Sequence, residues 1–478
     1  MGRRRNSIRD RICRFRRRGG NKYPHRNSSR SNRTERPPGM VGLKVNIEKV
    51  VAGGDGLTHL PDGRVLFVPF SLPAEELEVN ITREKKDYAV GEIKSVLTPS
   101  PDRICPICAH FGSCGGCQLQ HVSYEGEIKI KKTILKETIS RQTGINIQLE
   151  AVYPSPKEWG YRGKSEHPAA PSPGGPKIGY FRRRTHEVVD IKECPVLAPE
   201  MLSDLSKIRD IVRDTGEPIY DEEKGRGNLR YIILRSSSEG ERMIGLVTSG
   251  KDIEGDTIVR LMSDFKGLKG IVQNINTDKG NRIMGEHTEI ITGSDHLTEQ
   301  VGELELKVSF ASFFQANHSQ AERIVKVVRD YLVPDPSDVV VDAFAGVGMI
   351  GLALAGDVKE TVAVESEESS VRDGKRNAER NSLANVRWVK GEAGKVLGEI
   401  PCDKLILDPP RKGLTDNVIS SCSKVKPSHI CYVSCNPSTW ARDVVKFRDA
   451  GYILKRLSMI DMFPRTAHLE LASLLEAA

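Results

Sequence analysis

The pattern of apolar and polar positions changes at about residue 305. Beyond it, continuous apolar runs alternate with stretches whose apolar residues recur at helical spacing, such as HSQAERIVKVVRDYL. The apolar runs are VVVDAF, ETVAVES, DKLILDPP and HICYVSC. Because such runs are typical of parallel strands buried on both faces, residues 305–478 are predicted to form a doubly wound α/β domain.

Residues 41–98 have a different pattern, in which short β-rich runs are separated by turn residues. The runs are VNIEKVV, RVLFVPF, LEVNITR and AVGEIKSV, and Asp62-Gly63 is typical of a hairpin turn. This segment is predicted to be a small OB-like β-barrel. Arg83, Lys85 and Lys86 give the barrel a basic edge, which either blocks strand pairing or contacts RNA.

Residues 99–304 are predicted to form a β-rich central domain. They begin with a stretch dense in Cys and Gly, SPDRICPICAHFGSCGGCQLQH, followed by the helix-like run EGEIKIKKTILKETISRQTG. A chain of 478 residues is too long for one ordinary core, which also favours about three domains.

The composition, with 28% charged and 38% hydrophobic residues, is typical of a soluble globular protein. No apolar run approaches the roughly 20 residues of a membrane helix, so no membrane span is expected. The net charge of +8 comes from residues 1–40, which hold 13 Arg and Lys22 against Asp10 and Glu35, leaving −4 for the remainder. This tail, predicted to be disordered, is an RNA-binding arm, a transit peptide or an extension upstream of Met40, and we favour the last.

Ten cysteines occur without a secretory segment, which favours a reducing, cytoplasmic location over disulfides. Four of them form the pattern C-x2-C-x5-C-x2-C, whose spacing fits a structural zinc site: Cys105, Cys108, Cys114 and Cys117.

A glycine loop in VVVDAFAGVGMIGLALA separates a predicted strand from a helix, with Gly346 and Gly348 allowing close backbone approach to a ligand. Glu365 closes the next strand, 19 residues after Gly346, where an acid can bind ribose hydroxyls. The phosphate-binding GxGxxG is absent, so D-x-F-x-G-x-G, with Phe344, suits S-adenosylmethionine better than a dinucleotide. A tight packing turn is the structural alternative.

Two further strand ends carry candidate chemistry. Asp408 in LDPPRKG lies at the carboxyl edge of the predicted sheet, in a loop that either holds a base edge or is a simple turn. Cys435 in VSCNPSTWARD ends a strand just before a helix, whose N-terminus is expected to lower the thiol pKa and favour a nucleophile. Cys431, by contrast, is expected to be a packing residue.

The segments SCNPSTWARD, DPPRKG, DAFAGVG, SFFQAN and HLELASLL occur together in the order of the RNA 5-methyluridine methyltransferase family, which the chain resembles from residue 41 onward. CAHFGSCGGCQLQH resembles the iron–sulfur branch of that family, and residues 41–98 resemble its TRAM domain. The resemblance implies a Rossmann-like catalytic domain that uses S-adenosylmethionine to methylate uracil C5 in RNA.

The family chemistry explains why these residue types are needed. A thiolate adds to C6 of uracil, the activated C5 takes the methyl group, and a base removes the C5 proton before the thiolate leaves. The resemblance assigns these roles to Cys435 as nucleophile, Glu470 as base and Asp408 as the acid near the uracil edge. It assigns cofactor contacts to Gln315, Phe344, Gly346, Gly348, Glu365 and Asp408. Phe313 is assigned to base stacking, and Glu392 is placed where an adenine contact is expected.

The resemblance also implies a [4Fe–4S] cluster on Cys108, Cys114, Cys117 and Cys194, in place of the zinc set that includes Cys105. Its expected role is structural or RNA-positioning. The neighbouring stretches YRGKSEH and YFRRRTH supply basic residues that are either a solvated face or phosphate contacts: Arg162, Lys164 and Arg182 to Arg184.

We therefore predict a monomeric RNA uracil-C5 methyltransferase, with 23S ribosomal RNA as the expected substrate and the target base flipped out of its stack. The alternatives are methylation of the transfer RNA T-loop and a non-catalytic RNA-binding protein with a decayed methyltransferase domain. The intact set of Cys435, Glu470, Asp408 and Glu365 argues against decay. An RNA cytosine-C5 enzyme fits the residues around Cys435 less well.

Overall fold

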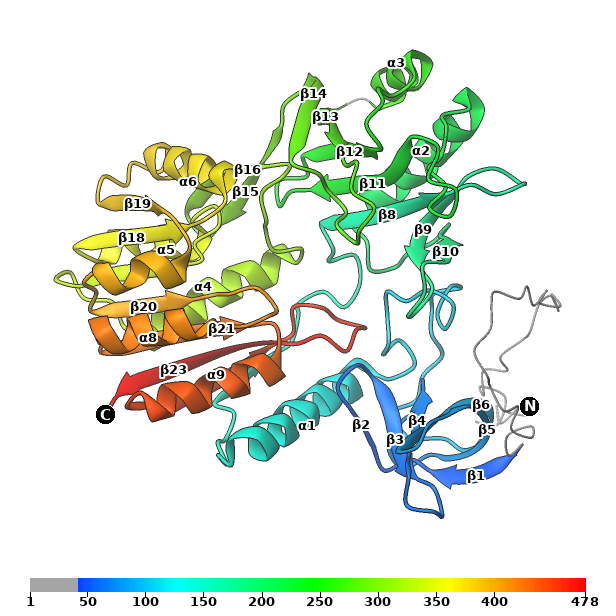
Figure 1. The fold of residues 1–478 in the computed structure, drawn as a ribbon, viewed down its shortest axis with the longest axis horizontal. Coiled ribbons are helices and arrows are strands. Elements are labelled where there is room, and N and C mark those ends of the chain that lie inside the picture. Colours follow the sequence, from blue (N-terminus) through cyan, green and yellow to red (C-terminus); the bar gives the residue numbers. More distant parts are fainter. Residues whose placement is uncertain (1–41, 266) are drawn as a thin grey trace, which may run out of the picture. The chain divides into compact units, whose positions relative to one another are not determined.

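The structure is a computed structural model that describes residues 42–265 and 267–478, so the predictions for the tail concern a segment outside the described residues. The chain divides into two compact units (Figure 1). The first comprises the described residues up to Ile107 together with Leu119–Gly126, and the second comprises Cys108–Gln118 and Glu127–Ala478. The short Cys-rich loop 108–118 therefore belongs to the second unit.

The first unit is a six-stranded sheet in the order β1-β5-β6-β4-β3-β2. Its strands are β1 Leu43–Asn46, β2 Lys49–Val50, β3 Asp55–His59, β4 Val65–Pro69, β5 Glu76–Glu84 and β6 Tyr88–Thr98. Alternate residues such as Leu77 and Val79 are fully buried in a small core of their own. The β3–β4 hairpin turns at Asp62-Gly63, where Gly63 has φ +85°, a conformation that favours glycine. The predicted N-terminal β domain and its hairpin turn are confirmed.

The C-terminal part of the second unit is built on an eight-stranded sheet in the order β19-β18-β17-β20-β21-β23-β22-β7. Its strands are β7 Ala151–Tyr153, β17 Val339–Ala343, β18 Glu360–Glu365, β19 Val386–Lys390, β20 Lys404–Leu407, β21 His429–Ser434, β22 Tyr452–Ile460 and β23 Glu470–Ala477. The first five strands in this order are parallel, as predicted for an α/β domain. β23 is inserted antiparallel to both β21 and β22.

Helices cover both faces of this sheet (Figure 1). They are α1 Tyr124–Thr143, α4 His318–Leu332, α5 Met349–Leu354, α6 Glu368–Arg380, α7 Ala393–Val396, α8 Asp416–Val425 and α9 Pro437–Asp449, with 3₁₀ turns η2 Ala355–Asp357 and η3 Leu397–Glu399. Neighbouring strand residues belong to different cores: Val341 packs with α1 and α7–α9, whereas Val340 packs with α4 and α5. This double burial explains the continuous apolar runs in the sequence.

A second, seven-stranded sheet, in the order β10-β9-β8-β11-β12-β13-β14, forms the central part of the same unit. Its strands are β8 Lys164–Ala170, β9 Lys177–Phe181, β10 Val188–Asp190, β11 Leu229–Ser236, β12 Arg242–Thr248, β13 Leu268–Ile275 and β14 His287–Gly293. Two helices that the sequence pattern did not indicate, α2 Pro199–Thr215 and α3 Gly255–Asp264, pack against it. A hairpin, β15 His296–Val301 and β16 Leu304–Ser309, spans the predicted domain boundary at residue 304.

Within the described ranges, no helix combines the length and apolar character needed to cross a membrane.

Candidate active site

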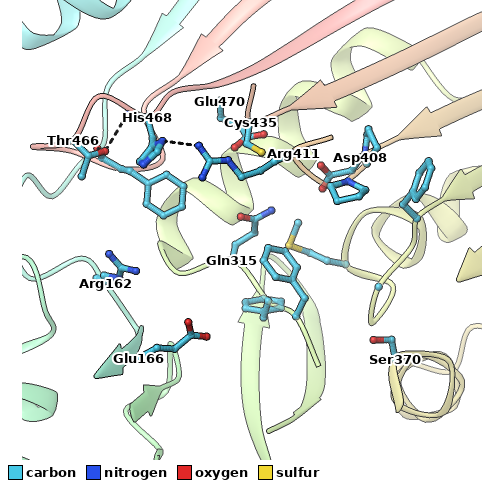
Figure 2. Close-up of a pocket in the computed structure, with 18 of the residues that line it drawn as sticks. Arg162, Glu166, Gln315, Ser370, Asp408, Arg411, Cys435, Thr466, His468 and Glu470 are labelled. Carbon is cyan, nitrogen blue, oxygen red and sulfur yellow. Dashed lines mark hydrogen bonds between the residues drawn. The ribbon is translucent and has the colours of Figure 1, made fainter. Parts of the chain in front are cut away.

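A cavity of about 1200 Å³ lies in the second unit, along the carboxyl edge of the eight-stranded sheet (Figure 2). Parallel strands end at the same edge, so the loops that follow β17, β18, β20 and β21 all reach this cavity. It therefore brings together the predicted catalytic residues and all the predicted cofactor contacts except Gly348, from positions far apart in the sequence.

Cys435 and Glu470 come together because β23 runs antiparallel to β21. Ser434, the last residue of β21, pairs with Leu471, so the next residues outward are Cys435 and Glu470. Figure 2 shows the Cys435 sulfur close to the Glu470 carboxylate, and each lines the cavity. The antiparallel insertion is what brings the predicted base to the predicted nucleophile.

The carboxyl groups of Asp408 and Glu470, next to Cys435, have pKa values above those of ordinary carboxyl groups. Burial raises the pKa of Asp408 to about 7. Burial, reinforced by the nearby Asp408, raises the pKa of Glu470 well above its ordinary value, although Arg411 opposes the shift. Near neutral pH the pair therefore retains a proton, as expected for a carboxyl group suited to proton transfer.

The Cys435 thiol behaves differently from the expectation drawn from its position before a helix. Burial and then the carboxyl group of Glu470 raise its pKa to about 11, while Arg411 works in the opposite direction. The prediction of a lowered thiol pKa is therefore wrong. Partial burial beside Glu470 and Asp408 raises the thiol pKa, and at the N-terminus of α9 the Asn436 side chain accepts a hydrogen bond from Ser438 N.

Two residues of SCNPSTWARD, Asn436 and Asp443, link the loop that carries Asp408 to the end of β21 that carries Cys435. The Asn436 amide donates to the carbonyl of Arg411 at 3.1 Å. Asp443 is fully buried and accepts from Leu414 N and from the Tyr432 hydroxyl, each at 2.8 Å. This packing fixes the position of the 408–414 loop relative to the end of β21.

The glycine loop after β17 has the form that the sequence predicts. Gly346 and Gly348 have φ of +56° and +92°, and Gly346 N donates to the Glu365 carboxylate at 2.9 Å. Both Glu365 and Phe344 line the cavity. Asp342, at the end of β17, is almost fully buried, and burial raises its pKa to about 8. Its Oδ1 has no hydrogen-bond partner within the described ranges, which leaves an acceptor for a polar ligand beside the glycine loop.

The SFFQAN loop brings Phe313 and Gln315 to the same cavity. Two buried side chains hold the backbone that leads into this loop. Arg235 donates hydrogen bonds to the carbonyls of Ser309, Phe310 and Ser312. Asp373 accepts hydrogen bonds from the hydroxyls of Ser309 and Ser312. Phe313 remains 64% exposed while its backbone is fixed, as expected for a side chain that stacks on a base.

A buried ion network anchors the segment that leads to Glu470. Lys131 on α1 is fully buried, 2.7 Å from Glu127 and 2.6 Å from Asp461. Arg465 donates from its backbone N to Glu127 at 2.8 Å, pairs with Glu158 and lies 4.6 Å from the Trp159 ring centre. Such a network fixes the turn between β22 and β23, and hence the start of β23.

The predicted RNA contacts divide between several places. Arg162 lines the cavity, where its guanidinium donates to the Lys164 carbonyl at 2.9 Å. Lys164 does not line the cavity and pairs with Glu166 at 3.2 Å. The predicted basic edge lies in the first unit, at the end of β5 and in the β5–β6 connection, where its residues are exposed: Arg83, Lys85 and Lys86. Glu392, which was predicted near the adenine of the cofactor, does not line the cavity and forms an ion pair with Lys395.

The four predicted cluster ligands gather at one side of the central sheet. Cys194 is in the core against which Cys114 and Cys117 pack, and Cys108 is within electrostatic range of Cys114 and Cys194. The donor chemistry suits a [4Fe–4S] cluster. However, among the described residues no three Cys, His, Asp or Glu side chains are arranged as metal ligands, so the geometry does not support the cluster. Cys105, part of the alternative zinc set, belongs to the first unit.

Three residues at the site were not predicted from the sequence. Arg411 stands inside the quoted motif DPPRKG and donates to His468 at 3.3 Å, so the motif itself held the signal. His468 lies two residues before Glu470 in HLELASLL, and burial followed by the charge of Arg411 lowers its pKa to about 4. Arg465 had no local signal, because its role depends on distant acids.

The chain is similar to known RNA methyltransferases. The family model for tRNA (Uracil-5-)-methyltransferase matches residues 256–478. An uncharacterized RNA methyltransferase of Halalkalibacterium halodurans is 33% identical over 443 residues, covering 91% of this chain and 96% of its own. One from Listeria monocytogenes is 34% identical over 440 residues, covering 91% and 97%. The crystal structure of Pyrococcus abyssi tRNA (uracil-54, C5)-methyltransferase with S-adenosyl-L-homocysteine superposes with a TM-score of 0.73 at 26% identity, covering 91% of this chain and all of that one.

Proposed function

Since the chain belongs to the RNA uracil-5-methyltransferase family, and is thus an S-adenosylmethionine-dependent RNA methyltransferase, we propose that Cys435 and Glu470 carry out its reaction on uracil C5. The observation that carries this proposal is the pairing of β21 with β23, which puts a thiol and a carboxyl group opposite each other at the edge of one cavity.

The proposed reaction uses these groups in sequence. The Cys435 thiolate forms a bond to C6 of uracil, which places negative charge on C5 and O4 and makes C5 nucleophilic. S-adenosylmethionine, when bound, supplies the electrophilic methyl group. Glu470 then accepts the C5 proton, and the C6–sulfur bond breaks to restore the double bond and the thiolate. Asp408, beside both groups, faces the uracil edge.

The cofactor is proposed to occupy the side of the cavity formed by β17, β18 and the SFFQAN loop. The glycine loop offers close backbone approach, Glu365 an acceptor for ribose hydroxyls and Asp342 a free carboxyl oxygen. Gln315 and Phe344 complete this side, and Phe313 is proposed to stack on the base.

Two RNA substrates have support of different kinds. The N-terminal β unit and the Cys-rich loop favour 23S ribosomal RNA through the family resemblance. The tRNA (uracil-54, C5)-methyltransferase that superposes on this chain favours transfer RNA. Purified protein supplied with methyl-labelled S-adenosylmethionine should label 23S rRNA but not transfer RNA transcripts if the first proposal holds. Labelled 5-methyluridine in transfer RNA alone would favour the second, and a protein that labels neither RNA would refute the proposed function.

We further propose that the first unit is a TRAM-type RNA-binding barrel, with Arg83, Lys85 and Lys86 at its RNA edge, and that the enzyme is a cytoplasmic monomer. We propose the [4Fe–4S] cluster from the family resemblance and from the thiol chemistry of Cys108, Cys114, Cys117 and Cys194, although these residues are not arranged as metal ligands in the structure. These thiolates would hold it in a structural role, outside the methyl transfer. About four iron and four sulfide per chain after anaerobic purification are expected, and metal-free active protein would refute the cluster.

A further inference from the structure

The charged residues that line the cavity are grouped by sign, except for Glu166 in the central part and Arg411 at the sheet edge. The sheet edge and its loops supply acids: Asp342, Glu365, Glu367, Asp408 and Glu470. The central part of the unit supplies most of the arginines: Arg162, Arg182, Arg183 and Arg184. Four of these acids, all but Glu367, belong to the chemistry described above, whereas the three consecutive arginines have no part in it.

These three arginines lie on a short hairpin turn between β9, which ends at Phe181, and β10, which begins at Val188. The turn is closed by backbone hydrogen bonds from Arg182 N to Glu187 O at 2.8 Å and from Thr185 N to Arg182 O at 3.0 Å. Arg184 takes the left-handed conformation, with φ +60°. Two backbone hydrogen bonds therefore close the turn that carries the three arginines.

The Cys-rich loop supports this turn by direct backbone contact. Gly115 N donates to Phe181 O at 2.9 Å, and Cys114 forms a β-bridge with Arg182. A Cβ atom on Gly115 would lie 2.8 Å from Phe181 O and 3.1 Å from the Arg183 Cα, so only glycine permits this approach. The Cys-rich loop thus holds the arginine turn against the cavity.

The three arginines differ in their surroundings. Arg182 forms a two-point ion pair with Glu187, with its Nε at 2.8 Å and a terminal nitrogen at 3.2 Å from the carboxylate. Arg183 is half-buried and Arg184 is exposed. Arg182 therefore shapes the turn, and Arg183 and Arg184 line the cavity beside it.

We propose that Arg183 and Arg184 form a phosphate clamp for the RNA strand next to the target uridine, an inference that rests on the proposed function. Cys435 can reach C6 only if the uridine leaves its stack and enters the cavity, so the adjoining phosphates must lie at the rim. The planar guanidinium group binds phosphate oxygens in pairs, which makes arginine well suited to this contact. The clamp recognises the backbone and holds the strand while the base is inserted.

The test compares R183Q/R184Q with R213Q/R260Q. The control removes the exposed Arg213 of α2 and the half-buried Arg260 of α3, which lie outside the cavity lining and pair with Asp214. The probe is a fluorescein-labelled RNA stem–loop with one loop uridine, and its binding is measured by anisotropy at several salt concentrations. The clamp variant should bind roughly tenfold more weakly, with the slope of log K against log salt reduced by about 1 for each arginine. The control should match the wild type.

Methyl transfer to the RNA that the wild type labels provides the second measurement. The clamp variant should show a KM about tenfold higher with kcat changed less than about twofold, since only binding of the strand is lost. An unchanged KM and salt slope would overturn the clamp even if the wild type is fully active. A wild-type protein without methyl-transfer activity, but with a salt slope that depends on these arginines, would refute the proposed function and leave the clamp as an RNA-binding site.

Discussion

On one wall of the cavity, Cys435, Asp408 and Glu470 stand at or next to strand ends, with their polar groups partly or fully buried. On the other wall, Arg183 and Arg184 stand on a hairpin turn and reach the solvent. Burial shifts the pKa of every titratable group in the first set upward. The difference separates two tasks: proton transfer needs perturbed groups on a rigid frame, whereas phosphate binding needs permanent charges that an RNA strand can reach.

The strongest test of this division is Cys435→Ala. Methyl transfer to RNA should fall by at least about 10⁴-fold, because no other group on the sheet edge can add to C6. Binding of S-adenosylhomocysteine, measured by calorimetry, and of the labelled stem–loop should stay within about twofold of wild type. Substantial residual activity would remove Cys435 from the mechanism.

Glu470→Gln separates the two halves of the reaction. The thiolate can still add and the methyl group can still transfer, but the C5 proton is no longer removed, so turnover should fall roughly 10²–10⁴-fold. A methylated protein–RNA adduct should then accumulate and appear as a slower band in denaturing gels. Cys435→Ala/Glu470→Gln is the matched control and should form no adduct. Loss of turnover without any adduct in the single variant would argue that Glu470 acts before methyl transfer.

Arg465→Met tests the buried network that fixes the start of β23. It leaves Glu127 without one of its cationic neighbours, and the loss should lower the free energy of unfolding by about 3–5 kcal/mol. Chemical denaturation provides the measurement. In Glu127→Gln/Arg465→Met the loss should be smaller than the sum of the single changes, since the uncompensated buried carboxylate is gone. Additive losses would mean that the two residues do not interact.

The smallest expected effect concerns the reactivity of Cys435 with pH. A thiol with its pKa raised to about 11 is mostly protonated at neutral pH, so its alkylation by iodoacetamide should become about tenfold faster per pH unit between 7 and 10. Asp408→Asn removes a nearby negative charge, which lowers the thiol pKa and should speed alkylation at pH 8 roughly threefold. Peptide mapping of Cys435 gives the rates. A slower reaction in Asp408→Asn would contradict the electrostatic account.

Much of the fold could be predicted from local sequence pattern. The helix predicted over HSQAERIVKVVRDYL occurs as α4, the four apolar runs became β17, β18, β20 and β21, and the Asp62-Gly63 turn joins β3 to β4. Each is a short-range feature, set by apolar spacing or by a residue that favours one backbone conformation. The middle of the chain was predicted less well, since α2 and α3 were not indicated and β7 joins the sheet of the C-terminal part.

The sequence by itself determined which chemical groups are present and that they stand at strand ends, because motif order and strand endings are local properties. Only the tertiary structure decided which of them meet. The antiparallel insertion of β23 sets Glu470 opposite Cys435, and the burial of both beside Asp408 reverses the expected direction of the thiol pKa shift. The contacts of Arg465 with Glu127 and Glu158 likewise join residues more than 300 positions apart. Register and burial arise from packing between distant segments, and no local pattern specifies them.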